Sequence, residues 1–267
     1  MVHITGIYVE DVRFPTSKDL TGSDAIHTDP DYSAAYVTIN TSEPNLNGFG
    51  IAFTIGKGND IVAECIRNYI SIFDGLNIKE VEKNIGKLWF ECVDHSQLRW
   101  LGPEKGVVHM AVAALFNALW DLISRKNKKP LWKFVVESDP ETIMNWLTFK
   151  YIEDVMSKDD AYNILKENQK YKKKRTEIIL KEGYPSYTTA AGWLGYSDKK
   201  ITDLCKQYMS RGWKHFKVKV GVNLQEDIKR LELIRSTIGK DCSIMIDANQ
   251  QWSVDQSIKH INELKKF

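Results

Sequence analysis

Two lysines and two oxygen-bearing side chains occur at spacings of two residues in segments that otherwise resemble strands. Lys217 and Lys219 lie in one such segment, and Asp247 and Asn249 lie in the next. Side chains i and i+2 of a strand share a face, so each pair points one way. A strand covered on both faces is normally an unbroken apolar run. Bare ammonium groups there cost several kcal/mol, so we expect something anionic beside the lysines.

The lysine pair could support several kinds of chemistry. Mutual repulsion and partial desolvation predict that the pKa of at least one of Lys217 and Lys219 is lowered. Such a lysine can act as a general base or as a Schiff-base nucleophile. Two ammonium groups can also hold a phosphate or carboxylate without proton transfer. The alternative is that neither lysine has a catalytic or binding role and that both side chains extend to solvent at the strand end.

Asp247 and Asn249 widen the choice of ligands. A carboxylate is a hard oxygen ligand that suits Mg²⁺, and an amide can donate to or accept from a substrate hydroxyl or carboxylate. One carboxylate does not make a magnesium site, because the ion needs near-octahedral oxygen coordination and usually two or more carboxylates. The alternative for Asp247 is an ion pair with Lys217 or Lys219 across the strands.

The elements around these residues alternate from Tyr187 onward. We expect strands at 187–194, 216–220 and 243–248, each followed by a helix. Ser197 can cap the first helix, Gly239 can end the second, and Ser253 with Gln256 is a capping box for the third. Polar residues at the carboxyl ends of successive strands predict the first part of a (β/α) barrel.

The earlier part of the chain differs. Strands are expected at 4–13 and 36–55 and helices at 60–73 and 104–125, which together predict an α+β unit. The basic stretch 158–181, with the run Lys172–Arg175, predicts a solvated helix face; the alternative is a nuclear address or a nucleic-acid patch.

Composition limits the partners. The 267 residues are 43% hydrophobic and 27% charged with a net charge of +2, which predicts a soluble globular protein of two domains with no nucleic acid or membrane as its main partner. No stretch is expected to approach a membrane span. Four cysteines without metal spacing predict buried free thiols in an intracellular, reducing compartment. Residues 1–15 alternate like a strand and show no clear presequence, so a cytoplasmic location stays open.

A family resemblance rests on specific segments together with these pairs. The lysine pair, the Asp-x-Asn pair, residues 22–32, residues 183–185 and residues 193–197 resemble the mandelate-racemase branch of the enolase superfamily. Within that branch they are similar to the L-fuconate dehydratases, which include an animal mitochondrial member. The resemblance runs along the whole chain.

The resemblance implies a fold and a reaction. The fold would be an α+β capping domain (1–150), a basic helical connector (151–186) and the first three βα units of an incomplete (β/α)₇β TIM-like barrel (187–267). The reaction would be the Mg²⁺-dependent conversion of L-fuconate to 2-keto-3-deoxy-L-fuconate, a hydro-lyase reaction by α-proton abstraction and β-elimination of water. A related acid-sugar dehydratase or epimerase is the alternative, as is an inactive chain that binds a partner. The mitochondrion would be the family's compartment.

The resemblance also implies roles for residues. Lys219 would be the acid/base, Lys217 would hold the substrate carboxylate, Asp247 would be a metal ligand and Asn249 a substrate contact. The first loop would bind the sugar acid through four residues, which are Gly22, Ser23, Asp24 and Tyr32. His27 and Asp29 are weaker candidates, since polar loop residues often only form turns.

The chain departs from the family after Asp247. The later strands, which in the family supply two more acidic ligands and a His/Asp dyad, do not follow in this sequence. None of the other histidines lies in a motif that could replace the dyad. We therefore expect this chain alone to be inactive, and to self-associate as a homo-oligomer or to associate with a full-length homologue.

Overall fold

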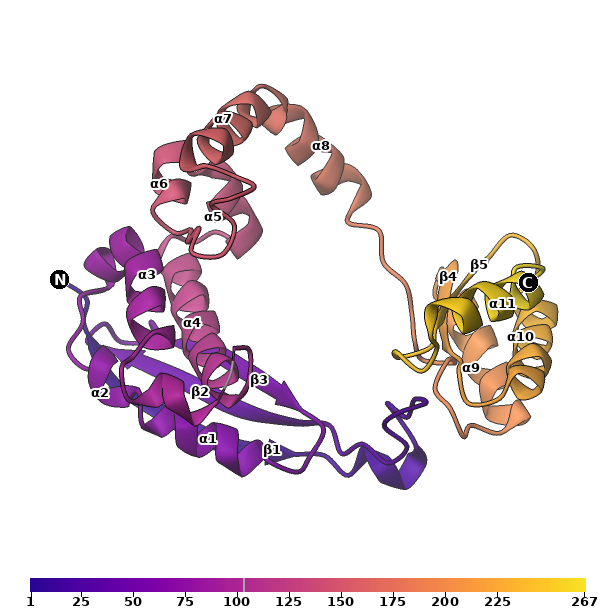
Figure 1. The fold of residues 1–267 in the computed structure, drawn as a ribbon. Coiled ribbons are helices and arrows are strands. Elements are labelled where there is room, and N and C mark those ends of the chain that lie inside the picture. The colour runs from indigo at the N-terminus through magenta and orange to yellow at the C-terminus, as the bar shows by residue number, and fades with distance from the viewer. Residues whose placement is uncertain (103) are drawn as a thin grey trace. The chain divides into compact units, whose positions relative to one another are not determined.

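The computed structural model describes residues 1–102 and 104–267, which divide into two compact units. The first comprises Met1–Arg13 and Ser33–Gly183, and the second comprises Phe14–Tyr32 and Tyr184–Phe267. The loop 14–32 thus interrupts the first unit in the sequence but packs with the C-terminal part of the chain. The elements of both units are labelled in Figure 1.

An antiparallel sheet forms the centre of the first unit. It contains β1 (Ile4–Arg13), β2 (Ser33–Thr41) and β3 (Gly48–Thr54) in that order. Alternate residues of β2 are fully buried, at Ala35, Val37 and Ile39. This period of two marks a sheet with one face against a core.

Helix α4 (Val107–Lys126) covers that face of the sheet and contacts β3, β2 and α1. It is long and apolar enough to cross a membrane, so the expectation that no stretch approaches a membrane span is wrong for this helix. Its composition has a physical reason, because 61% of the apolar stretch is buried inside the unit, which requires apolar residues on several faces.

Further helices complete the first unit, and the first three of them add buried side chains to this core. They are α1 (Asn59–Arg67), α2 (Ile70–Phe73), α3 (Ile78–Val93), α5 (Leu131–Glu137), α6 (Pro140–Met144), α7 (Lys158–Asn168) and α8 (Lys172–Glu182). The helix expected at 60–73 is therefore two helices. Helix α8 begins with the basic run, whose residues Lys173, Lys174 and Arg175 are exposed, as a solvated face requires.

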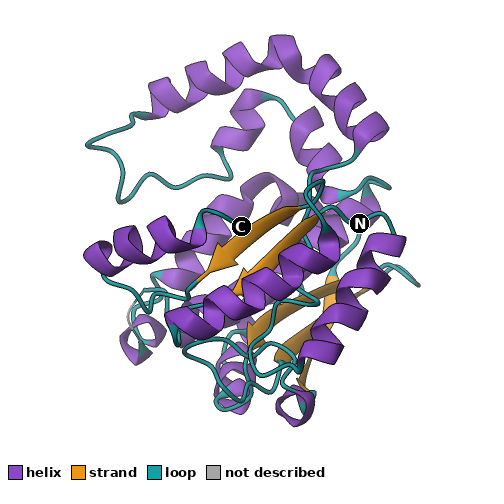
Figure 2. Ribbon diagram, turned by 90° about the vertical axis from the view of Figure 1, so that its right-hand side faces the viewer, coloured by secondary structure: helices purple, strands orange, loops and turns teal. Residues whose placement is uncertain are grey.

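Two parallel strands and three helices form the second unit. Strands β4 (His215–Lys219) and β5 (Ser243–Asp247) pair so that Lys219 lies opposite Asp247. The helices are α9 (Asp198–Ser210), α10 (Leu224–Ile238) and α11 (Val254–Leu264). The predicted capping box of Ser253 and Gln256 is confirmed. Figure 2 shows the strands lying against helices.

The strand expected at 187–194 is wrong in its extent. Only Thr188 pairs with β4, through an isolated parallel bridge to Phe216. The segment then turns, and the N–H of Gly192 donates to the carbonyl oxygen of Thr189 at 2.9 Å. It stays against β4, because a Cβ on Gly192 would lie 2.0 Å from the carbonyl oxygen of Lys217, which leaves no room for a side chain.

The core of the second unit explains why the lysines face the other way. Phe216, Val218 and Val220 are almost fully buried and pack with the helices. The alternation of β4 then places Lys217 and Lys219 on the opposite face. All four cysteines, Cys65, Cys92, Cys205 and Cys242, are buried free thiols, as predicted.

Candidate active site

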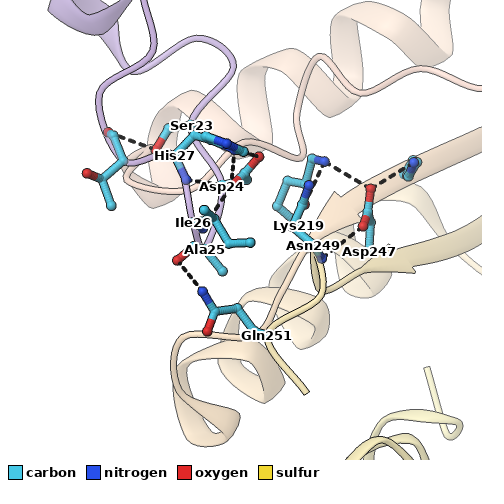
Figure 3. A network of polar contacts seen from close by, with 11 residues as sticks. Ser23, Asp24, Ala25, Ile26, His27, Lys219, Asp247, Asn249 and Gln251 are labelled. Atoms are coloured by element: carbon cyan, nitrogen blue, oxygen red, sulfur yellow. Dashed lines mark hydrogen bonds and ion pairs between the residues drawn. The ribbon is translucent and has the colours of Figure 1, made fainter. Parts of the chain in front are cut away.

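A cluster of opposite charges lies at the carboxyl ends of β4 and β5. Lys219 Nζ donates to Asp247 Oδ2 at 2.9 Å and to Asn249 Oδ1 at 2.8 Å (Figure 3). Lys217 Nζ lies 2.9 Å from the same oxygen of Asp247. The group expected to face the lysines is therefore Asp247 of this chain. Lys219 is only 8% exposed, so it does not extend to solvent.

The charges in this cluster change the acidities of its members. The hydrogen bond that Lys217 donates to Asp247 raises the pKa of Lys217 above its usual value. Burial pushes the pKa of Asp247 up, but the hydrogen bonds from Lys217 and Lys219 outweigh it and hold this pKa well below its usual value. The prediction is that the pKa of at least one of the two lysines is lowered. For Lys217 the shift has the opposite direction, because that prediction lacked the shared carboxylate.

Backbone geometry fixes the position of Asn249. Its φ of +47° lies in the left-handed region, which Asn tolerates better than most residues. Its N–H donates to Asp247 Oδ1 at 3.0 Å, so each carboxylate oxygen of Asp247 has a donor. Unusual backbone conformations of this kind concentrate at functional sites.

Two aromatic rings flank the lysines, and the sequence interpretation missed both. Lys217 Nζ lies 5.2 Å from the ring centroid of Tyr187, and Lys219 Nζ lies 5.6 Å from that of Trp193. The ring of Tyr32 meets that of Trp193 edge-on at 6.3 Å. A ring face within about 6 Å attracts an ammonium group electrostatically, so the rings help to position the lysines. The sequence feature that could have predicted these rings is the aromatic residues of segment 187–194, which were interpreted only as part of a strand.

Hydrogen bonds within the loop 14–32 hold its residues in place. The carboxylate of buried Asp24 accepts from the N–H groups of Ile26 and His27, each at 2.8 Å, and lies 3.1 Å from His27 Nδ1. Burial raises the pKa of Asp24, but the hydrogen bonds from His27 and Ile26 lower it below its usual value. Buried Ser23 donates to the carbonyl oxygen of Thr28 at 3.2 Å. Asp24 and Ser23 therefore shape the loop.

Gly22 allows the loop to close on Tyr32. Its φ is +92°, and a Cβ there would lie 2.4 Å from the Tyr32 ring. Burial raises the pKa of Tyr32, so its hydroxyl keeps its proton near neutral pH. Asp29 is exposed at the loop surface.

Several hydrogen bonds join the loop to the rest of the second unit. Gln251 Nε2 donates to the carbonyl oxygen of Ala25 at 3.0 Å (Figure 3), and the N–H of Leu194 donates to that of Ser23 at 3.0 Å. The hydroxyl oxygens of Thr21 and Tyr196 lie 2.8 Å apart. The loop residues predicted to bind substrate and the predicted lysines thus lie in one compact unit.

The metal expected at Asp247 does not fit the residues of this chain alone. Over residues 1–102 and 104–267, no three His, Cys, Asp or Glu side chains are grouped so that they could hold an ion. Asp247 is a single carboxylate, and both its oxygens already accept hydrogen bonds. Mg²⁺ usually needs at least one more carboxylate, which these residues do not supply.

Comparisons with known proteins indicate the family and the fold. Residues 200–267 match the family model described as "Enolase C-terminal domain-like". The chain is 43% identical over 269 residues to an L-galactonate dehydratase from Hypocrea jecorina, covering 100% of this chain and 60% of the relative. The crystal structure of human mitochondrial enolase superfamily member 1 is 44% identical, with a TM-score of 0.93, over 99% of this chain and 60% of that one.

More distant structures share the fold. The L-talarate dehydratase from Polaromonas sp. JS666, complexed with Mg and L-glucarate, is 18% identical with a TM-score of 0.64, over 100% of this chain and 58% of that one. These matches confirm the expected α+β unit followed by the first part of an enolase-type barrel. The chain spans about 60% of the length of the curated relatives it matches.

Proposed function

The chain belongs to the enolase superfamily, and on this premise we propose that it forms the lysine-bearing part of a sugar-acid dehydratase, a hydro-lyase. The observation that carries the proposal is the cluster of Lys217, Lys219 and Asp247 in the same compact unit as the loop 14–32. The similarity to an L-galactonate dehydratase supports a sugar acid as the class of substrate.

The lysines have distinct roles in this proposal. Lys217, whose pKa is raised, stays cationic and attracts the substrate carboxylate. Only the neutral amine of a lysine has a lone pair, so Lys219 would take the proton from the α-carbon after it has lost its own proton and its hydrogen bonds to Asp247 and Asn249 have opened. Loss of that proton creates an enediolate whose added negative charge a neighbouring ammonium stabilises more than it stabilises the substrate.

Elimination completes the reaction. The electron pair of the enediolate moves into a new double bond between the α- and β-carbons while the carboxylate re-forms. The β carbon–oxygen bond breaks, and the hydroxyl leaves as water with a proton from an acid of the complete site. The resulting enol converts to the 2-keto-3-deoxy acid. The sugar chain would be bordered by Gly22, Ser23, Asp24, Tyr32 and Asn249. Of these, Ser23 and Asp24 would act through the shape of the loop.

We propose L-fuconate as the substrate and Mg²⁺ as the cofactor of the complete site. Support for L-fuconate is the resemblance of residues 22–32 and 193–197, and L-galactonate is the competing substrate named by a relative. Asp247 would supply one ligand, and the others would come from outside the 267 residues. Relatives named as mitochondrial support a mitochondrial location.

A chimera tests this proposal. Residues 1–267 are joined to the C-terminal part of the human relative and assayed with Mg²⁺ for 2-keto acid formation from L-fuconate and L-galactonate. Lys219→Ala should reduce turnover by about 10²–10⁴-fold, the usual contribution of a general base. The matched control is Lys206→Ala, at an exposed lysine of α9. A folded chimera that turns over neither acid contradicts the proposal.

A second candidate function is non-catalytic association. Ile258 and Ile261 of α11 are 59% and 48% exposed, and β5 pairs with only one strand of the described part of the chain. Exposed apolar residues beside a free strand edge favour binding of another chain, either a second copy or a full-length homologue. Co-elution of the 267-residue chain with the human relative would support this role, and two separate peaks would contradict it.

A further inference from the structure

The side chain of Arg230 in α10 forms hydrogen bonds with the backbone at the carboxyl end of β4. Its Nη1 donates to the carbonyl oxygen of Lys219 at 2.7 Å, and its Nη2 donates to those of Gly192 and Trp193 at 3.2 and 3.1 Å. One guanidinium therefore joins the backbone of the proposed base to the segment that carries the ring beside it. The planar fork of an arginine suits such multiple bonds, which the point charge of a lysine cannot reproduce.

Asp227, one helical turn earlier, holds the next residues of the same strand end. Its Oδ2 accepts from the N–H of Gly221 at 2.8 Å, and the residue is 2% exposed. Gly221 has a φ of +117°, so the chain turns sharply there. Together Asp227 and Arg230 fix the backbone on both sides of the point at which β4 ends.

The hydrogen bonds of Arg230 reach the backbone of Lys219 and not the carbonyl oxygen of Lys217 among the described residues. The backbone N–H of Lys219 donates to the carbonyl oxygen of Gly192 at 2.8 Å, so Arg230 binds an oxygen that already belongs to the contact between segment 187–194 and β4. The carbonyl oxygen of Lys217 is not among its partners in the described part of the chain. Loss of the guanidinium should therefore release Lys219 and Trp193 while leaving Lys217 in place.

We propose that Arg230 is a positioning residue that fixes Lys219 and Trp193 for the reaction without contacting the substrate. This inference rests on the proposed function and deepens it. Removing the guanidinium takes the arginine donor from the carbonyl oxygens of Lys219 and Trp193, while that of Gly192 keeps the N–H of Lys219, so the strand end moves to regain hydrogen bonds. A displacement of about 1 Å of a reacting group can cost about 10²-fold in rate.

Arg235 provides a matched control on the same helix. Its guanidinium also donates to three carbonyl oxygens, those of Phe267, Gly239 and Cys242, at 2.6–2.7 Å. These partners lie at the other end of α10, away from the lysines. Replacing either arginine removes a guanidinium that binds three carbonyl oxygens. Of these two arginines, only Arg230 binds the backbone of Lys219.

The test measures how accessible the side chain of Lys219 is, and it needs no enzymatic activity. The 267-residue chain and its Arg230→Met, Arg230→Lys and Arg235→Met variants are treated briefly with an acylating reagent at one pH. Peptide mass spectrometry then gives the ratio of labelling at Lys219 to that at Lys217. General unfolding would expose both lysines, and the Arg235→Met variant shows how far lost stability alone changes the ratio.

We expect Arg230→Met to raise this ratio about tenfold through local opening of the strand end, Arg230→Lys to raise it less, and Arg235→Met to leave it unchanged. An unchanged ratio in a folded Arg230→Lys protein overturns the inference, and so does an equal rise in Arg235→Met. In the active chimera, Arg230→Lys should lower kcat more than it raises KM. A chimera without activity would contradict the proposed function and leave the labelling result valid.

Discussion

At the scale of residues, the charged cluster joins side chains from the ends of two neighbouring strands. The spacing of Lys217 and Lys219 places them on one face, and parallel pairing brings Asp247 opposite Lys219. Asn249 lies beyond β5 with a left-handed φ, so the spacing alone does not place its side chain. The guanidinium of Arg230 could not be foreseen in this way, since its partners are backbone oxygens of other segments. Only its place on the face of α10 that includes buried Leu231 and Ile234 indicates an unusual role.

Asp247 should stabilise the fold in a pH-dependent way. We expect Asp247→Asn to lower the free energy of unfolding at pH 7 by about 1–2 kcal/mol, because two ammonium groups lose their shared anion. The pKa of Asp247 is lower in the folded chain than its usual value of 3.8. Its contribution is therefore complete above about pH 4 and is lost as the pH falls through the folded pKa. Urea unfolding of both proteins from pH 7 to pH 3 measures this.

An exposed lysine–aspartate pair provides the control for this change. Asp203 lies 2.6 Å from Lys199 on α9, and their side chains are 58% and 86% exposed. Such surface pairs contribute little to stability, so Asp203→Asn should unfold like the parent protein. If Asp203→Asn and Asp247→Asn lower the stability equally at pH 7, the cluster has no special role in the fold.

At the scale of elements, periodicity predicts helices and strands that pack regularly and fails where the chain turns against a neighbour. The strand at 243–247 and the capping box of α11 follow from local patterns. Segment 187–194 has strand-like residues, yet Gly192 packs its backbone on that of Lys217, so the chain leaves the strand direction. Such close approach depends on tertiary contacts, which propensity does not contain.

Close approach also governs the contact between β3 and α4. A Cβ on Gly50 would lie 2.2 Å from the carbonyl oxygen of Ala114, which is backbone and cannot move aside cheaply. We expect Gly50→Ala to destabilise the protein by about 2–3 kcal/mol because the helix must shift away from the sheet. Thermal unfolding followed by circular dichroism measures this. Gly6→Ala in β1 is the control, since the nearest atom to its Cβ would be 3.5 Å away; a similar loss in both variants would refute this account.

At the scale of the whole molecule, each compact unit is built from two segments that are separated in the sequence. Phe14–Tyr32 lies between two strands of the first unit but belongs to the second. Composition and periodicity cannot predict this, because the loop is tied by single hydrogen bonds to residues such as Leu194 and Gln251, which lie far along the chain. The family resemblance alone implied that the first loop meets the barrel.

A single cut in the chain tests this interleaving. Residues 183–186 are exposed, so a specific protease site inserted there should be cleaved without disturbing either core. The larger product keeps the loop 14–32, and the smaller one keeps the strands β4 and β5. Because the loop packs inside the second unit, we expect the two products to co-elute in native buffer and to separate in urea.

The loop contacts should account for this association. Thr21→Val removes the hydroxyl that lies 2.8 Å from that of Tyr196, and Gln251→Ala removes the donor to the carbonyl oxygen of Ala25. The cleaved double variant should dissociate at lower urea concentration than the cleaved parent, since each lost hydrogen bond weakens the contact by about 1 kcal/mol. A Thr202→Val variant, whose hydroxyl donates only within α9, serves as the control. Separation of the parent products in native buffer would mean that residues 14–32 do not hold the second unit, and the loop would then lose its proposed place beside the lysines.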